Sequence, residues 1–145
     1  MTAEIQPKKK RVDGQITGLA GEFFVAAELL KRNLQVSVTF GNAKSIDLFA
    51  FNETVGEHGR TYNVQVKAVR YRNFFPLRRA AIHPEQVYVF VILNPPGKSP
   101  DYFIAWGWQL LEYERTTRGI DALKFPGIHY GDLEPFRDQW EVFEG

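Results

Sequence analysis

The chain has 145 residues, of which 44% are apolar and 14% aromatic, a composition that suits one domain with a single core. It contains no cysteine, which excludes disulfides, cysteine zinc sites and a thiol nucleophile. No run of about 18 apolar residues is present and the N-terminus lacks an apolar signal region, so we expect a soluble, cytoplasmic protein without a membrane span.

The net charge of +1 hides an asymmetry along the chain. Residues 1–79 hold 13 Lys/Arg against 7 Asp/Glu, a balance of +6, whereas residues 80–145 hold 5 against 10, a balance of −5. This distribution predicts a basic face suited to a polyanion, with ordinary surface charge as the alternative.

Two regions are expected at the N-terminus. Residues 1–15 are polar and basic, with the run Lys8–Arg11, and are predicted to form a flexible basic arm ahead of a single domain over 16–145. Thr17 is expected to cap a helix that ends near Asn33. The apolar residues predicted to face the core from this helix recur at helical spacing: Leu19, Phe23, Ala26, Ala27 and Leu30.

Strand signals follow the helix. Apolar patterns predict strands over 36–40, 46–51 and 61–69, the last two joined by a glycine-containing hairpin connection. The run at 87–93 is the strongest strand, and 102–106 is its expected hairpin partner. Residues 70–85 are left irregular, a second helix is predicted over 108–118, and the tail from Tyr130 is expected to fold back on the body. The order predicts an α/β domain with a mixed sheet of about five strands flanked by helices.

Four polar residues stand within these apolar segments. Glu22 interrupts the inward stripe of the first helix, and Asp47 is the only charge from 45 to 51. Gln65 and Lys67 share one face of the third strand because side chains alternate along a strand. Such groups are costly to bury unless they meet partners, with a structural ion pair as the alternative for Glu22. If the strands are neighbours, the four groups converge.

Their chemistry suits a hard cation. Mg²⁺ or Mn²⁺ prefers oxygen ligands, which Asp47, the Gln65 side chain and Glu22 can supply. Such an ion polarises a phosphate and acidifies water, and Lys67 can orient the nucleophile and offset negative charge. The residues therefore predict a phosphodiesterase centre.

These segments resemble the PD-(D/E)XK, or restriction-endonuclease-like, nuclease superfamily. The resemblance covers residues 17–70, and 87–106 look like the last two core strands of that fold. It implies a metal-dependent DNA endonuclease with Glu22 as the helix acid, Asp47 as the main metal ligand and Lys67 as the catalytic lysine. Gln65 stands where the family usually has Asp or Glu, a variant also known in Mrr-like enzymes.

Six residues near these motifs are predicted to contact nucleic acid: Lys44, Ser45, Arg70, Arg72, Arg78 and Arg79. The partner is expected to be duplex or branched DNA, and two copies of a one-centre chain are needed to cut both strands, which predicts a homodimer. The three histidines lack zinc-ligand spacing, and no phosphate-binding glycine-rich loop is present. The alternatives are a Holliday junction resolvase-like enzyme and a non-cutting nucleic-acid-binding module with the same fold.

Overall fold

The computed structural model describes residues 14–113 and 126–145 of the chain. In chain order the elements are α1 (Gly14–Lys31), β1 (Gln35–Val38), β2 (Leu48–Asn52), β3 (Arg60–Val69), β4 (Phe74–Pro76), η1 (Arg79–Ala81), β5 (Val87–Ile92), β6 (Asp101–Trp106), α2 (Gly107–Glu112), β7 (Gly127–His129), η2 (Tyr130–Phe136) and η3 (Trp140–Glu144).

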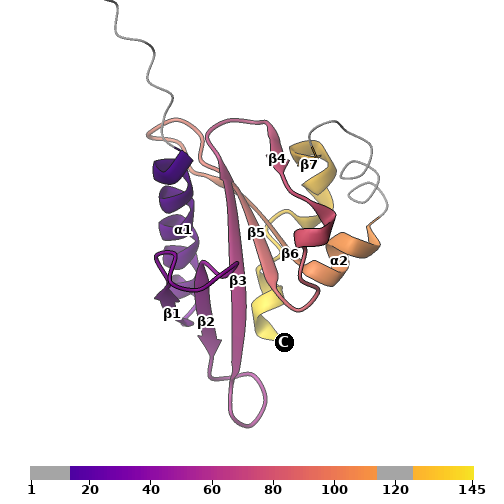
Figure 1. Ribbon diagram of the computed structural model, residues 1–145. Coiled ribbons are helices and arrows are strands. Elements are labelled where there is room, and N and C mark those ends of the chain that lie inside the picture. Colours follow the sequence, from indigo (N-terminus) through magenta and orange to yellow (C-terminus); the bar gives the residue numbers. More distant parts are fainter. Residues whose placement is uncertain (1–13, 114–125) are drawn as a thin grey trace, which may run out of the picture.

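Five of the strands form one mixed sheet in the order β1-β2-β3-β5-β6. β3 and β5 are parallel, and the other neighbours in this sheet are antiparallel. The predicted α/β class with a mixed five-stranded sheet is therefore confirmed. In Figure 1, α1 lies on one side of this sheet, and α2 with the separate β4–β7 pair lies on the other.

The core is divided between the two faces of the sheet, and β5 contributes to both. All six of its residues are buried, as its uninterrupted apolar sequence predicts for a strand covered on both faces. The α1 side is filled by residues such as Val25, Leu29, Val64, Val89 and Ile104. The opposite side is filled by residues such as Phe75, Tyr88, Phe90, Leu110 and Ile128. Phe136, Trp140 and Phe143 of the tail are also buried, as expected.

The inward face of α1 differs from the prediction. Its buried residues are Thr17, Gly21, Val25, Ala26 and Leu29. Of the stripe expected to face the core, only Ala26 is buried, and the prediction was wrong because this helix carries apolar residues on both its sheet-facing and its outward sides. The expected cap was also wrong: α1 begins at Gly14, and Thr17 lies inside it.

Other expectations differ in smaller ways. Residues 74–76 of the stretch left irregular form β4, which pairs with β7 about fifty residues later. The second helix spans Gly107–Glu112, and 114–118 lie outside the described residues, as do residues 1–13 of the expected arm. Within the described part of the chain, no helix has the length and apolar character needed to cross a membrane.

Candidate active site

The candidate site lies where β2 separates from β3. The pairing of these strands begins at Leu48 opposite Val64, whereas β3 continues to Val69 with β5 as its partner in the sheet. Asp47 occupies the place that the next residue of β2 would take. Its backbone N–H donates to the carbonyl of Val64 at 2.9 Å, and its Oδ2 accepts from the N–H of Val66 at 2.8 Å. A carboxylate thereby replaces a strand as the partner of this stretch of β3.

The loop before β2 is held in a defined shape. The buried Thr39 donates from Oγ1 to the carbonyl of Ile46 at 2.7 Å, and its N–H donates to the carbonyl of Asp47 at 3.0 Å. Phe40 and Ser45 both have positive φ, 51° and 62°, a conformation that costs non-glycine residues free energy and is concentrated at functional sites. The loop therefore adopts two unfavourable backbone conformations and places Asp47 at the edge of β3.

Glu22 reaches the same place from α1. Gly21 allows the helix to approach β3 closely, because a Cβ at this position would lie 2.6 Å from the Cβ of Ala68. The half-buried carboxyl of Glu22 shares a hydrogen bond with that of Asp47. Burial, this hydrogen bond and repulsion from Asp47 together raise the pKa of Glu22 to about 7. Two carboxyl groups in contact must share a proton or a cation.

Gln65 and Lys67 border this pair on β3. The Nε2 of Gln65 donates to the backbone carbonyl of Ser45 at 3.0 Å, which leaves Oε1 of the amide as the atom that can act as a ligand. Lys67 is partly buried. Burial lowers the pKa of Lys67, and the nearby carboxylate of Asp47 opposes that shift. The structure thus brings all four predicted residues to one end of β3.

The donor set consists of oxygen atoms, the ligands that a hard divalent cation prefers. Within residues 14–113 and 126–145, no group of three or more His, Cys, Asp or Glu side chains could enclose a metal ion. Two carboxyl groups with an amide oxygen suit Mg²⁺, which keeps several waters and needs few protein ligands. A cation between the carboxyl groups would relieve the repulsion that helps to raise the pKa of Glu22.

The predicted nucleic-acid contacts divide into two groups. Arg70 is used within the fold, because its Nε donates to the Oγ1 of Thr17 on α1 at 3.0 Å. Ser45 is partly buried, and its carbonyl holds Gln65. The other four side chains are exposed: Lys44, Arg72, Arg78 and Arg79.

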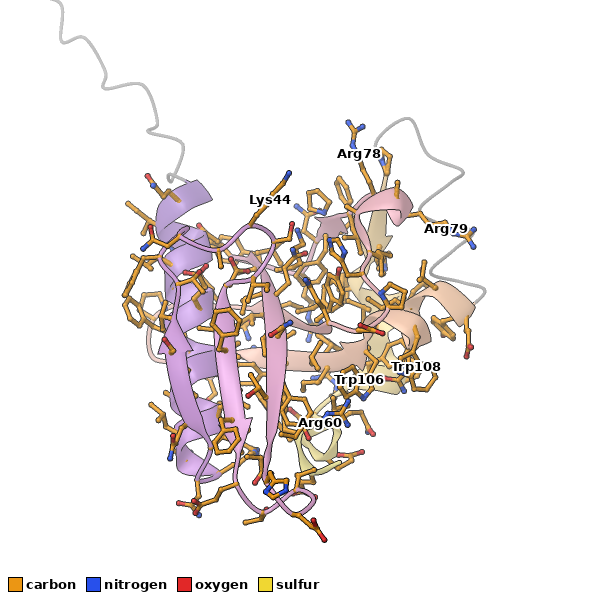
Figure 2. The ribbon with its side chains drawn as sticks, turned by 60° about the horizontal axis from the view of Figure 1, so that its bottom comes forward. Lys44, Arg60, Arg78, Arg79, Trp106 and Trp108 are labelled. Atoms are coloured by element: carbon orange, nitrogen blue, oxygen red, sulfur yellow. The ribbon has the colours of Figure 1, made fainter. Side chains whose placement is uncertain are left out.

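Two of the exposed cations lie near the candidate centre. Arg78 lines an open pocket of about 450 Å³ together with Lys67, Phe74 and Leu77. Lys44 belongs to the loop that carries Asp47, and Figure 2 shows Lys44 and Arg78 projecting from the same end of the molecule. This end can meet a phosphate backbone.

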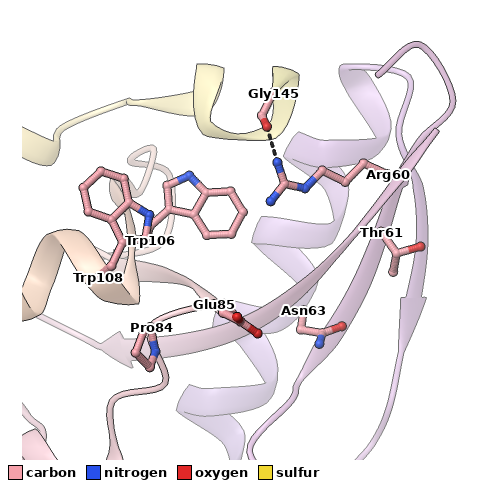
Figure 3. A pocket seen from close by; sticks show the side chains of 8 residues that line it. All are labelled: Arg60, Thr61, Asn63, Pro84, Glu85, Trp106, Trp108 and Gly145. Carbon is pink, nitrogen blue, oxygen red and sulfur yellow. Dashed lines mark hydrogen bonds between the residues drawn. The ribbon is translucent and has the colours of Figure 1, made fainter. Parts of the chain in front are cut away.

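A second pocket, of about 530 Å³, lies at the other end of β3 (Figure 3). Trp106 and Trp108 line one part of it, and Arg60 stacks 4.8 Å from the centre of the Trp106 ring and donates to the backbone oxygen of Gly145. Asn63 of this pocket is four residues from Lys67, roughly 13 Å along an extended strand. This pocket is separate from the carboxyl pair.

Sequence reasoning missed the residues that position the site through backbone atoms. Thr39 orients the loop, the N–H of Val66 fixes Asp47, and Thr17 anchors Arg70. A buried threonine and a backbone N–H carry no distinguishing pattern in a single sequence. Gly21 directly before Glu22 was the one available signal, since glycine inside a helix usually has a packing reason.

Comparisons with known proteins identify the fold. No family model matches the sequence, and no curated protein matches it. Among solved structures, the chain is similar to one described as a bacterial homing endonuclease, I-Ssp6803I, with 15% sequence identity and a TM-score of 0.57. The similarity covers 90% of this chain and 91% of that one. The chain therefore shares the overall fold of that structure.

Proposed function

We propose that this chain is a divalent-metal-dependent endonuclease that hydrolyses phosphodiester bonds in DNA, with a centre of the PD-(D/E)XK type in which Gln65 replaces the second acid. The observation that carries this proposal is the contact between Glu22 and Asp47 at the edge of β3, with the partly buried Lys67 beside it. The fold shared with a structure described as a homing endonuclease supports the same activity.

Each residue has a distinct role in this proposal. Asp47, Glu22 and the Oε1 of Gln65 would hold Mg²⁺ or Mn²⁺, which when bound polarises the scissile phosphate and acidifies a water molecule. The ammonium group of Lys67 orients the attacking water and offsets negative charge in the transition state. Asp47 keeps its position through the N–H of Val66, so its carboxylate is preorganised.

The substrate would approach the end of the molecule that carries Lys44 and Arg78. Both side chains are exposed and extend from segments next to the centre, where they can bind phosphates on either side of the scissile bond. A chain with one centre cuts one strand, so double-strand cleavage requires two copies. The active species is therefore proposed to be a homodimer.

The test is cleavage of plasmid, linear, single-stranded and four-way-junction DNA with Mg²⁺, Mn²⁺ or a chelator. We expect metal-dependent cleavage that Asp47→Asn and Lys67→Ala abolish. Lys98→Ala is the matched control, because Lys98 is exposed in the turn between β5 and β6. Unchanged cleavage by both site variants would reject the mechanism.

Gln65→Glu tests the departure from the usual motif. The added carboxylate supplies a third acidic oxygen, so we expect retained or increased cleavage and tighter Mn²⁺ binding. Complete loss of cleavage in a folded variant would argue against Gln65 as a ligand.

The same DNA substrates and variants distinguish the two alternative functions. A resolvase-like enzyme would cut the four-way junction in preference to linear duplex. A non-cutting module would bind DNA but give no heat on titration with Mn²⁺, whereas the proposed centre binds the ion and loses that binding in Asp47→Asn.

A further inference from the structure

The outward face of α1 is apolar along most of its length. Every exposed position between 16 and 30 on this helix carries an apolar residue. Among the described residues, eight large hydrophobic side chains are exposed, and six of them lie on α1 or in the loop after β1: Ile16, Leu19, Phe23, Phe24, Leu30 and Phe40, at 39–64% exposure. A contiguous exposed apolar surface of this kind normally marks an interaction site.

Five of these side chains form one continuous stripe, which we call the α1 stripe: Ile16, Leu19, Phe23, Leu30 and Phe40. Phe24 lies about 100° round the helix from Phe23 and lines a pocket with Glu28 and Arg32. Ile16, Phe23 and Leu30 are seven residues apart, and Leu19 lies between the first two on the same side. This is the spacing of a helix that packs against another helix along its length. Phe40 extends the stripe, because its ring centre lies 6.1 Å from that of Phe23.

We propose that the α1 stripe binds the α1 stripe of a second copy of this chain around a two-fold axis. Aromatic side chains bury about 150–250 Å² each, so the exposed halves of Phe23 and Phe40 give on the order of 200 Å² per copy. With Ile16, Leu19 and Leu30 the pairing removes about 1,000 Å² in total, the area at which specific interfaces begin.

The apolar composition of the α1 stripe favours a second copy of this chain over a nucleic acid. A nucleic acid would require cations, yet no exposed charge interrupts the stripe between 16 and 30. A face that matches itself across a two-fold axis is the usual basis of a homodimer, and Phe23, midway between Ile16 and Leu30, lies at its centre.

The pairing has a consequence that rests on the proposed nuclease function. Glu22 directly precedes Phe23 and faces the sheet, so the helix that forms the interface also carries one acid of the candidate centre. Two centres would then be fixed on either side of the axis, as cleavage of two strands requires.

Sedimentation of the metal-free full-length protein at micromolar concentration tests the pairing without reference to activity. We expect a two-chain mass that persists at high salt, because the contact is apolar. Leu30→Glu and Ile16→Lys should each give the one-chain mass, and an equimolar mixture of the two should recover dimers, because a two-fold axis at Phe23 places position 30 of one copy opposite position 16 of the other. Trp108→Glu, which alters a side chain of similar exposure outside the stripe, should leave the dimer intact.

A crosslink tests the location. The chain contains no cysteine, so Phe23→Cys can form a disulfide only between copies. We expect oxidation to give a crosslinked dimer, and none for Trp108→Cys. A one-chain mass for the unmodified protein, or dimers unaffected by both Leu30→Glu and Ile16→Lys, would overturn the proposal. Because neither measurement involves cleavage, an inactive protein that dimerises would reject the nuclease proposal alone.

Discussion

At the scale of single residues, the candidate centre combines a pair of acidic side chains with backbone support. Asp47 accepts a hydrogen bond from the N–H of Val66 and contacts the carboxyl group of Glu22. The charge of Asp47 and its oxygen that accepts from Val66 can therefore be removed separately. The effect of each change on stability can be measured in the metal-free protein.

The first prediction compares two substitutions of Asp47. Asp47→Asn keeps an acceptor for Val66 and removes the charge next to Glu22, so the thermal midpoint in chelator should be unchanged or raised. Asp47→Ala leaves the N–H of Val66 without that acceptor and should lower the free energy of unfolding by about 1–3 kcal/mol. Equal stability of the two variants would show that the hydrogen bond contributes little.

The second prediction concerns pH. The carboxyl of Glu22 keeps its proton to a higher pH in the folded chain, with a pKa of about 7, than in the unfolded chain, near 4.5. Its contribution to stability is therefore full below about pH 4.5 and is lost as the pH rises through about 7.

Thermal unfolding in chelator from acidic to neutral pH measures this contribution. The midpoint should decline across that range, and Glu22→Gln should reduce the decline. Glu28→Gln is the control on the same helix, since Glu28 pairs with Arg32 at 2.9 Å and not with Asp47. The same decline in Glu22→Gln and the unmodified chain would contradict the assignment.

At the scale of elements, the site depends on how α1 packs on β3. Gly21 lies against Ala68, and Arg70 of the segment after β3 donates to Thr17 on α1. The helix is thus fixed to the β3 region at Thr17 and at Gly21, one helical turn apart. Glu22 directly follows Gly21. The depth of the helix on the sheet determines whether the carboxyl group meets Asp47.

The third prediction uses two glycines on this helix. Gly21→Ala should destabilise the chain by about 1–3 kcal/mol, because the new Cβ would lie 2.6 Å from that of Ala68, and should reduce cleavage by displacing Glu22. Gly18→Ala meets nothing within 4 Å and should stabilise the helix by up to about 1 kcal/mol.

Unfolding in urea and a cleavage assay measure both effects of the glycine substitutions. Adding Ala68→Gly to Gly21→Ala should restore part of the loss, because it removes the opposing Cβ. If both glycine variants behave alike, close packing at Gly21 is not what positions Glu22.

At the scale of the whole molecule, sequence and structure agree most where the signal is local. The apolar run of β5 and the isolated charges at Glu22, Asp47 and Lys67 were readable, because each contrasts with its immediate neighbours. The strand pairing of β4 with β7 was not, since the partners are about fifty residues apart. The inward face of α1 could not be predicted either. Exposed residues such as Phe23 recur at the helical spacing that normally marks the buried side.

The fourth prediction concerns the basic end of the molecule. Arg78 is exposed beside Lys67, so Arg78→Ala should weaken binding to duplex DNA and reduce the slope of log affinity against log salt by about 0.9, the value for one lost phosphate contact. Lys98→Ala should leave the slope unchanged. Fluorescence anisotropy over a salt series with non-cleavable DNA gives the slope. Equal slopes for the two variants would show that Arg78 does not contact the DNA.

The Asp47 carboxylate belongs to the proposed metal centre and also accepts a hydrogen bond from the N–H of Val66. These two roles should constrain how position 47 evolves. If the chain has the proposed nuclease function, a descendant that lost this function would incur little penalty for replacing Glu22 or Lys67, because these side chains are costly to bury. Position 47 would still have to retain an oxygen for the N–H of Val66. Among inactive descendants, the first two positions should therefore vary freely, while Asp, Asn or another short acceptor persists at the third.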